Sequence, residues 1–149
     1  MNNPVSFEIS KLLKEKGFDE PTNRYYENAL TSRKDPETND FKGSFGWRKD
    51  ETNLQPGYFK NNYDMADLSS KNWYMCSAPT IAEVVCWIYS KYNIWIQVSI
   101  LKDNEWHYSI RRKENNWEIE FPTKEKFSSI KESYQKGIEV ILNTYKPTS

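Results

Sequence analysis

The chain has 149 residues and no formal net charge, because 21 lysines and arginines balance 21 aspartates and glutamates. A neutral chain lacks the basic excess with which general nucleic-acid-binding proteins and membrane-surface proteins neutralise phosphates. No apolar run approaches the roughly 20 residues that span a bilayer, and the first residues do not resemble a signal peptide. Only two cysteines occur, which favours the reducing cytoplasm over a secreted disulfide scaffold. This length predicts a single domain over residues 1–149.

The first predicted element is a helix over about 6–16. Ser6 can cap its N-terminus, and Gly17 stands where a left-handed residue often ends a helix. Residues 19–72 are then rich in proline, glycine, asparagine and aspartate, interrupted by short aromatic pieces. We expect this insertion-like segment to be irregular, with one or two short strands around 24–31 and 42–48.

The second helix has the clearest start signal in the sequence. Pro79 stands near its first turn, and Thr80 with Glu83 fits a capping box. Three residues remain alternatives for the N-cap: Ser77, Ala78 and Thr80. We expect the helix to end near Tyr92, with Asn93 in the left-handed conformation.

The rest of the chain predicts a sheet followed by a third helix. Apolar residues alternate with polar or aromatic ones in three consecutive segments: about 94–101, 105–112 and 117–121. Pro122-Thr123 is expected to open a helix over about 124–145, in which Gly137 permits close packing on the sheet. The predicted fold is α+β: a three-stranded antiparallel meander packed with about three helices, plus a long irregular aromatic-rich segment.

Aromatic residues make up 15% of the chain, more than these elements easily bury. The start of the second helix is a candidate anion site, because free amides and the helix dipole attract negative charge. Ser77 and Thr80 would add hydroxyl donors, and Trp73 and Tyr74 could stack on a base. The alternative is an ordinary capped helix beside core aromatics.

A second group of candidates places cations beside aromatic rings. Trp47-Arg48-Lys49 has this arrangement, and Tyr26 follows Arg24 and Tyr25. Such groups suit a planar phosphorylated ligand or a hot spot for a protein partner. The alternative is a loop packed on the body of the domain.

The sequence contains no convincing catalytic or metal-binding set. His107 is the only histidine, and it has no recognised ligand spacing to Cys76 or Cys86. We therefore expect no cofactor, no metal and no enzymatic activity.

Three stretches together resemble small uncharacterised proteins encoded by phages and prophages of gut bacteria. They are residues 7–18, residues 77–85 with 87–89, and residues 94–96, and the resemblance covers about half of the chain. It implies a phage accessory protein in the cytoplasm of a bacterial host. It implies no catalytic residues.

These observations lead to three hypotheses. The first is a non-enzymatic, homo-oligomeric protein that sequesters a nucleotide-derived small molecule, such as an immune signal of the host. The second is a protein that inhibits a host defence enzyme by binding to it. The third, favoured least, is a phosphodiesterase-type enzyme that degrades the signal. None of them involves a nucleic-acid polymer or a membrane.

Overall fold

The structure is a computed structural model that describes residues 1–29, 52–59, 73–119 and 125–148. These residues form helices and two antiparallel sheets, which confirms the predicted α+β class. The chain divides into two compact units. The helical unit comprises Met1–Lys16 and Pro79–Ser149, and the inserted unit comprises Gly17–Ala78. The inserted unit therefore interrupts the helical unit in sequence, and most of it is the segment predicted to be insertion-like.

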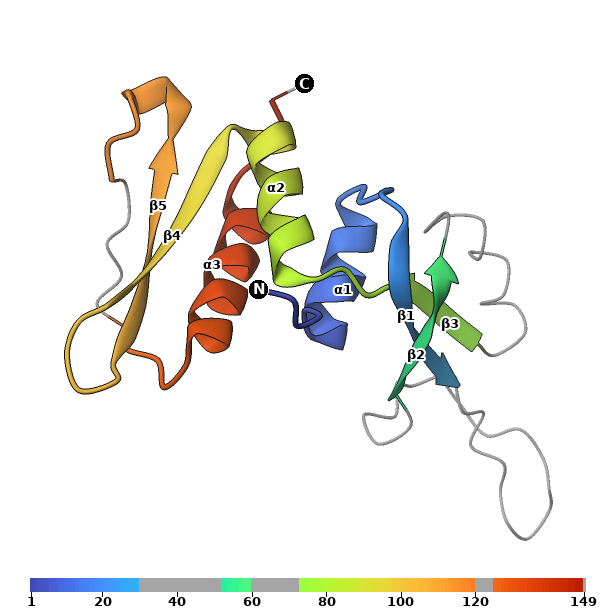
Figure 1. The fold of residues 1–149 in the computed structure, drawn as a ribbon. Coiled ribbons are helices and arrows are strands. Elements are labelled where there is room, and N and C mark those ends of the chain that lie inside the picture. Colours follow the sequence, from blue (N-terminus) through green and yellow to red (C-terminus); the bar gives the residue numbers. More distant parts are fainter. Residues whose placement is uncertain (30–51, 60–72, 120–124, 149) are drawn as a thin grey trace, which may run out of the picture. The chain divides into compact units, whose positions relative to one another are not determined.

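The helical unit has a sheet on one side and helices on the other (Figure 1). Its elements are α1 (Phe7–Glu15), α2 (Ile81–Tyr92), β4 (Ile94–Ile100), β5 (Trp106–Arg112), a short 3-10 helix (Lys113–Asn115) and α3 (Ile130–Thr144). Both α2 and α3 contact the sheet, and α1 contacts α3. None of the helices in the described ranges is long and apolar enough to cross a membrane.

The apolar stripes of these elements meet in one core. Its most deeply buried side chains are Val5, Leu13, Ile81, Val84, Ile88, Ile94, Ile96, Ile110, Ile138, Ile141 and Leu142. In β4 the alternation holds at the first positions, where Ile94 and Ile96 are buried and Trp95 and Gln97 are exposed. The core-facing side of the sheet is therefore the side predicted from the alternation.

Local signals set the ends of the first two helices as predicted. The Ser6 hydroxyl accepts a hydrogen bond from the Ile9 amide at 3.3 Å, and Gly17 has a φ of 95°. Asn93 ends α2 with a φ of 54°, in the left-handed region. Ser6 and Asn93 bond to residues three and four positions away, so nearby residues were sufficient to predict these two helix ends.

Gly137 lies where α3 packs closely on the sheet. A Cβ atom at this position would lie 3.2 Å from Cδ2 of Tyr108 and 3.3 Å from Cγ2 of Ile96. Real Cβ atoms rarely approach neighbours this closely. The expectation that this glycine permits close packing is confirmed.

The start of the third helix was predicted wrongly. α3 begins after Ser129, whose hydroxyl accepts a hydrogen bond from the Glu132 amide at 3.1 Å. Phe127, expected in the helix, instead exchanges two backbone hydrogen bonds with Trp106, at 2.8 and 2.9 Å. This strand-type pairing engages the backbone of Phe127, so the helix starts after this residue. Pro122 and Thr123 lie outside the described residues.

The predicted third strand of the meander corresponds to isolated bridges rather than to a described strand. Ile119 pairs with Arg111, and Phe127 pairs with Trp106, both antiparallel and both with β5. Residues 120–124, between these two bridges, lie outside the described part of the chain. The continuous sheet that the structure describes here has two strands, β4 and β5.

The inserted unit contains a three-stranded antiparallel sheet in the order β2–β1–β3. Its strands are β1 (Thr22–Ala29), β2 (Thr52–Phe59) and β3 (Trp73–Ser77). β1 confirms the strand expected around 24–31, whereas 42–48 lies outside the described residues. β2 and β3 were not predicted. β2 contains Pro56 and Gly57, which a strand at the edge of a sheet tolerates because its outer amides need no partner.

Candidate functional site

The predicted anion site at the start of α2 has its amides already engaged. Thr80 is the N-cap, which decides among the three alternatives, and it forms the expected capping box with Glu83. The Thr80 amide donates to Glu83 Oε2 at 2.7 Å, and the Glu83 amide donates to Thr80 Oγ1 at 3.2 Å. The amides of Ile81 and Ala82 donate to the carbonyls of Asn3 and Met1 at 3.0 and 3.2 Å. An anion at this end would have to displace the N-terminal segment, so its binding there stays a prediction.

Replacing Thr80 with alanine is expected to lower the free energy of unfolding by about 1 kcal/mol, because the Glu83 amide loses its acceptor. Thr80→Ser keeps the hydroxyl and is the matched control. Urea denaturation followed by circular dichroism measures both. Equal losses for alanine and serine would contradict the capping role.

The remaining predicted site residues belong to β1, to β3 and to a stretch outside the described residues. Ser77 is the last residue of β3 and lies opposite Tyr25, whereas Tyr26 lies opposite Cys76. Because neighbouring residues of a strand point to opposite faces, Ser77 and Tyr26 lie on different faces of the sheet. Trp73 and Tyr74 occupy β3 opposite Ala29 and Asn28. Trp47, Arg48 and Lys49 lie outside the described residues.

A different group of aromatic residues meets on the surface of the helical unit. We call Tyr89, Trp95 and Trp117 the aromatic surface. The rings of Tyr89 and Trp117 stack at 5.9 Å with an interplanar angle of 10°, and Trp95 meets Tyr89 edge-on at 5.8 Å. Tyr89 and Trp95 are each 43% exposed. The aromatic surface is therefore built by three elements: α2, β4 and the turn after the 3-10 helix.

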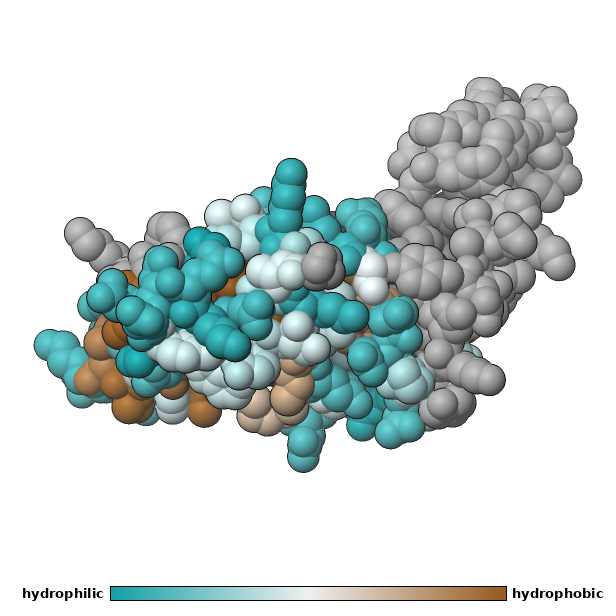
Figure 2. Space-filling view, turned by 90° about the horizontal axis from the view of Figure 1, so that it is seen from above, coloured by the Kyte–Doolittle hydropathy of each residue, from teal (hydrophilic) through white to brown (hydrophobic). Residues whose placement is uncertain are grey.

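A row across the sheet extends this surface. Trp95 lies directly opposite Arg111 on β5, and Arg111 lies opposite Ile119 through its isolated bridge. Residues directly opposite each other share a face, so the row presents a ring, a guanidinium and an aliphatic chain side by side. Ile119 is 49% exposed. Figure 2 shows brown, apolar side chains gathered on the side of the helical unit where β4 and β5 lie.

Trp117 has an unusual backbone conformation. Its φ is 62°, and the preceding Asn116 has a φ of 51°. A left-handed conformation is common for asparagine, but a bulky side chain adopts it rarely, at a cost on the order of 1–3 kcal/mol. The Trp117 amide donates to the Arg112 carbonyl at 3.0 Å, which fixes the turn. Strain of this kind persists where the surrounding structure holds the backbone in place. The strained conformation places the indole of Trp117 against the ring of Tyr89.

The aromatic surface was not predicted from the sequence, although one signal for it is present. Trp95 occupies the polar side of the alternation in β4, beside Gln97 and Ser99. A large aromatic residue on the solvent side of a strand is more informative than a buried one. Tyr89 and Trp117 are too far from Trp95 in sequence for local patterns to join them.

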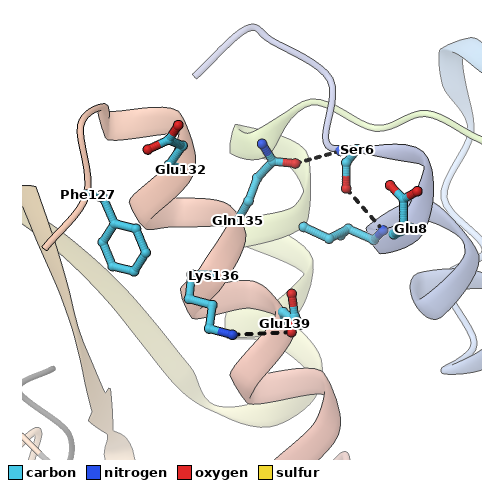
Figure 3. A pocket seen from close by; sticks show the side chains of 8 residues that line it. Ser6, Glu8, Phe127, Glu132, Gln135, Lys136 and Glu139 are labelled. Carbon is cyan, nitrogen blue, oxygen red and sulfur yellow. Dashed lines mark hydrogen bonds and ion pairs between the residues drawn. The ribbon is translucent and has the colours of Figure 1, made fainter. Parts of the chain in front are cut away.

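A groove between α1 and α3 has different chemistry (Figure 3). It encloses about 370 Å³ and is lined by Ser6, Glu8, Ile9, Phe127, Glu132, Gln135, Lys136 and Glu139. Gln135 Oε1 accepts a hydrogen bond from the Ser6 amide at 2.7 Å, which ties the two helices together. Lys136 lies 3.5 Å from Glu139 Oε1. With three carboxylates and one ammonium group, this groove disfavours a phosphorylated ligand.

The helical unit thus presents a cluster of aromatic rings at its surface and, between α1 and α3, a groove lined mainly by carboxylates. Within the described ranges, no cluster of three or more histidine, cysteine, aspartate or glutamate side chains could hold a metal ion. Comparison with known proteins adds no relative: no family model, no curated protein and no solved structure matches the chain.

Proposed function

We propose that this chain is a non-enzymatic binding protein that docks onto a folded protein partner through the aromatic surface. The observation that carries the proposal is the meeting of three large rings at the surface, in which Tyr89 contacts both Trp95 and Trp117. Tryptophan and tyrosine dominate the binding energy of protein interfaces, because each buries a large rigid area at little entropic cost.

The surroundings of the rings support a protein partner. Ile119 adds an exposed aliphatic side chain and Arg111 a cation, and arginine is also enriched in interface hot spots. Tyr89 and Trp117 stack directly on each other, so a base cannot insert between these two rings. The resemblance to phage proteins makes a host defence enzyme the partner to test first.

The experiment compares wild-type protein with Trp95→Ala, using each as bait for purified host defence enzymes and for lysates of hosts that carry them. We expect Trp95→Ala to weaken capture about tenfold or more, the usual effect of losing a central hot spot. Ile130→Ala is the control, because Ile130 is also 43% exposed but lies at the start of α3. A partner retained equally by Trp95→Ala would overturn the proposal.

A second candidate function is the sequestration of a nucleotide-derived molecule. It is favoured by the position of Arg111 opposite Trp95, which sets a cation beside an exposed aromatic face. A thermal-shift screen with cyclic dinucleotides, cyclic trinucleotides and ADP-ribose derivatives tests it. A ligand at 100 times its dissociation constant stabilises by about 2.7 kcal/mol, which shifts the melting temperature by several degrees. A selective shift that Arg111→Gln removes would favour this function over protein binding.

A further inference from the structure

We infer that the free edge of β4 pairs with the same edge of a second copy of this chain, which joins two β4–β5 sheets into one. β4 is paired only with β5 in the described structure, so its other side is an edge. Exposed edges usually carry a charge, a proline or a bulge that blocks pairing. The sequence from Ile94 to Ile100 contains no charged residue and no proline.

The hydrogen-bond pattern identifies the groups that point away from β5. The Lys113 amide donates to the Asn93 carbonyl at 3.1 Å, and the Leu101 amide donates to the Glu105 carbonyl at 2.8 Å. Bonded residues alternate along an antiparallel pair, so the odd-numbered residues of β4 bond to β5. The N–H and C=O groups of Ile96, Val98 and Ile100 therefore face the free edge.

The sequence of β4 is nearly symmetric about Gln97, which fits a two-fold axis at this residue. Antiparallel pairing in this register sets Ile96 opposite Val98 of the second copy and Ile94 opposite its Ile100. Both pairs match apolar side chains and join residues whose backbone groups face the edge, so each pair can form two hydrogen bonds. Gln97 then faces Gln97 of the second copy.

Two of the other outer strands, β5 and β2, are less suitable. The outer side of β5 already bonds to Ile119 and Phe127 at isolated bridges. β2 contains Pro56, which lacks an amide. β4 instead ends in Ile100, which is 52% exposed, and is followed by Leu101, which is 53% exposed. In the proposed dimer, Ile94 of the second copy would cover Ile100. Trp95 would stay on the open face of the sheet, where a protein partner could still reach it. This inference is therefore independent of the proposed function.

Sedimentation velocity at low salt, from about 1 to 100 µM protein, tests the pairing. We expect wild-type protein to form a dimer in this range. Gln97→Lys puts two ammonium groups opposite each other at the axis and is expected to weaken the dimer about tenfold. Gln97→Glu is expected to do the same, and an equal mixture of both variants is expected to form heterodimers. Asn143→Lys is the control, since it adds the same charge on an exposed position of α3.

Amide hydrogen exchange separates strand pairing from any other interface. In the dimer, the amides of Ile96 and Val98 are expected to exchange more slowly as the protein concentration rises. A wild-type protein that stays monomeric over the whole range would overturn the inference. A dimer that Gln97→Lys leaves unchanged, or in which these two amides exchange at the monomer rate, would overturn it equally.

Discussion

Replacing Gly137 with valine is expected to lower the free energy of unfolding by about 3 kcal/mol. A first carbon at this position would already lie 3.2 Å from the Tyr108 ring and 3.3 Å from Ile96. The two methyl groups of valine would have to move α3 away from the sheet or force both neighbours out of their rotamers. Ile96 and Ile138 are completely or almost completely buried around this contact, so either movement would lower the free energy of unfolding.

Urea denaturation of Gly137→Val and Gly137→Ala measures this effect. Alanine needs its neighbours to yield by only a few tenths of an ångström, and it favours the helix over glycine by about 1 kcal/mol. We therefore expect Gly137→Ala to stay within about 1 kcal/mol of wild type. A valine variant as stable as wild type would mean that α3 does not lie this close to the sheet.

The second prediction is a gain in stability. Tyr92→Phe is expected to raise the free energy of unfolding by about 1–2 kcal/mol. Tyr92 is 2% exposed, and among the described residues its hydroxyl has no hydrogen-bond partner. In the unfolded chain water satisfies this hydroxyl, so folding costs its desolvation. Phenylalanine keeps the ring, which meets Trp87 edge-on at 5.7 Å.

The same burial predicts how stability depends on alkaline pH. Burial raises the pKa of Tyr92 above its ordinary value of 10.0, and it raises the pKa of Tyr134 in the same way. Above pH 10 the unfolded chain releases these protons while the folded chain keeps them, so the stability falls as the pH rises. Tyr92→Phe is expected to make this fall less steep, and Tyr134 still contributes to it in the variant.

Urea titrations at pH 8 and at about pH 10.5 measure both effects. Tyr145→Phe is a suitable control, since Tyr145 lies after α3 and is only half-buried. A Tyr92→Phe variant less stable than wild type at pH 8 would show that the hydroxyl has a partner.

Local patterns predicted those parts of the fold that depend on near neighbours. Ser6, Thr80 with Glu83, and Asn93 set helix ends through contacts within one turn. The alternation of β4 and β5 was also sufficient, because their register follows from a short connecting turn. The sequence thus predicted the class, the first two helices and the central hairpin.

The predictions that failed concern elements whose backbone pairs with residues far away in the sequence. Phe127 looks like part of a helical stripe, but its backbone bonds to Trp106 delay the start of α3. β2 and β3 exist through pairing with β1 across long stretches of sequence, and the proline and glycine in β2 hide its strand character. The aromatic surface was missed for the same reason, since its three rings come from three separate elements.

The insertion of one unit within the other has a consequence for how the protein assembles. The Ser6 amide bonds to Gln135, 129 positions away, and α1 packs against α3. During synthesis, α1 therefore leaves the ribosome long before its partner helix exists. A nine-residue helix is marginal in water by itself, so we expect α1 to stay largely unfolded until α3 is made. Closing so long a loop is slow, which makes the docking of α1 a late step that chaperones and proteases can intercept.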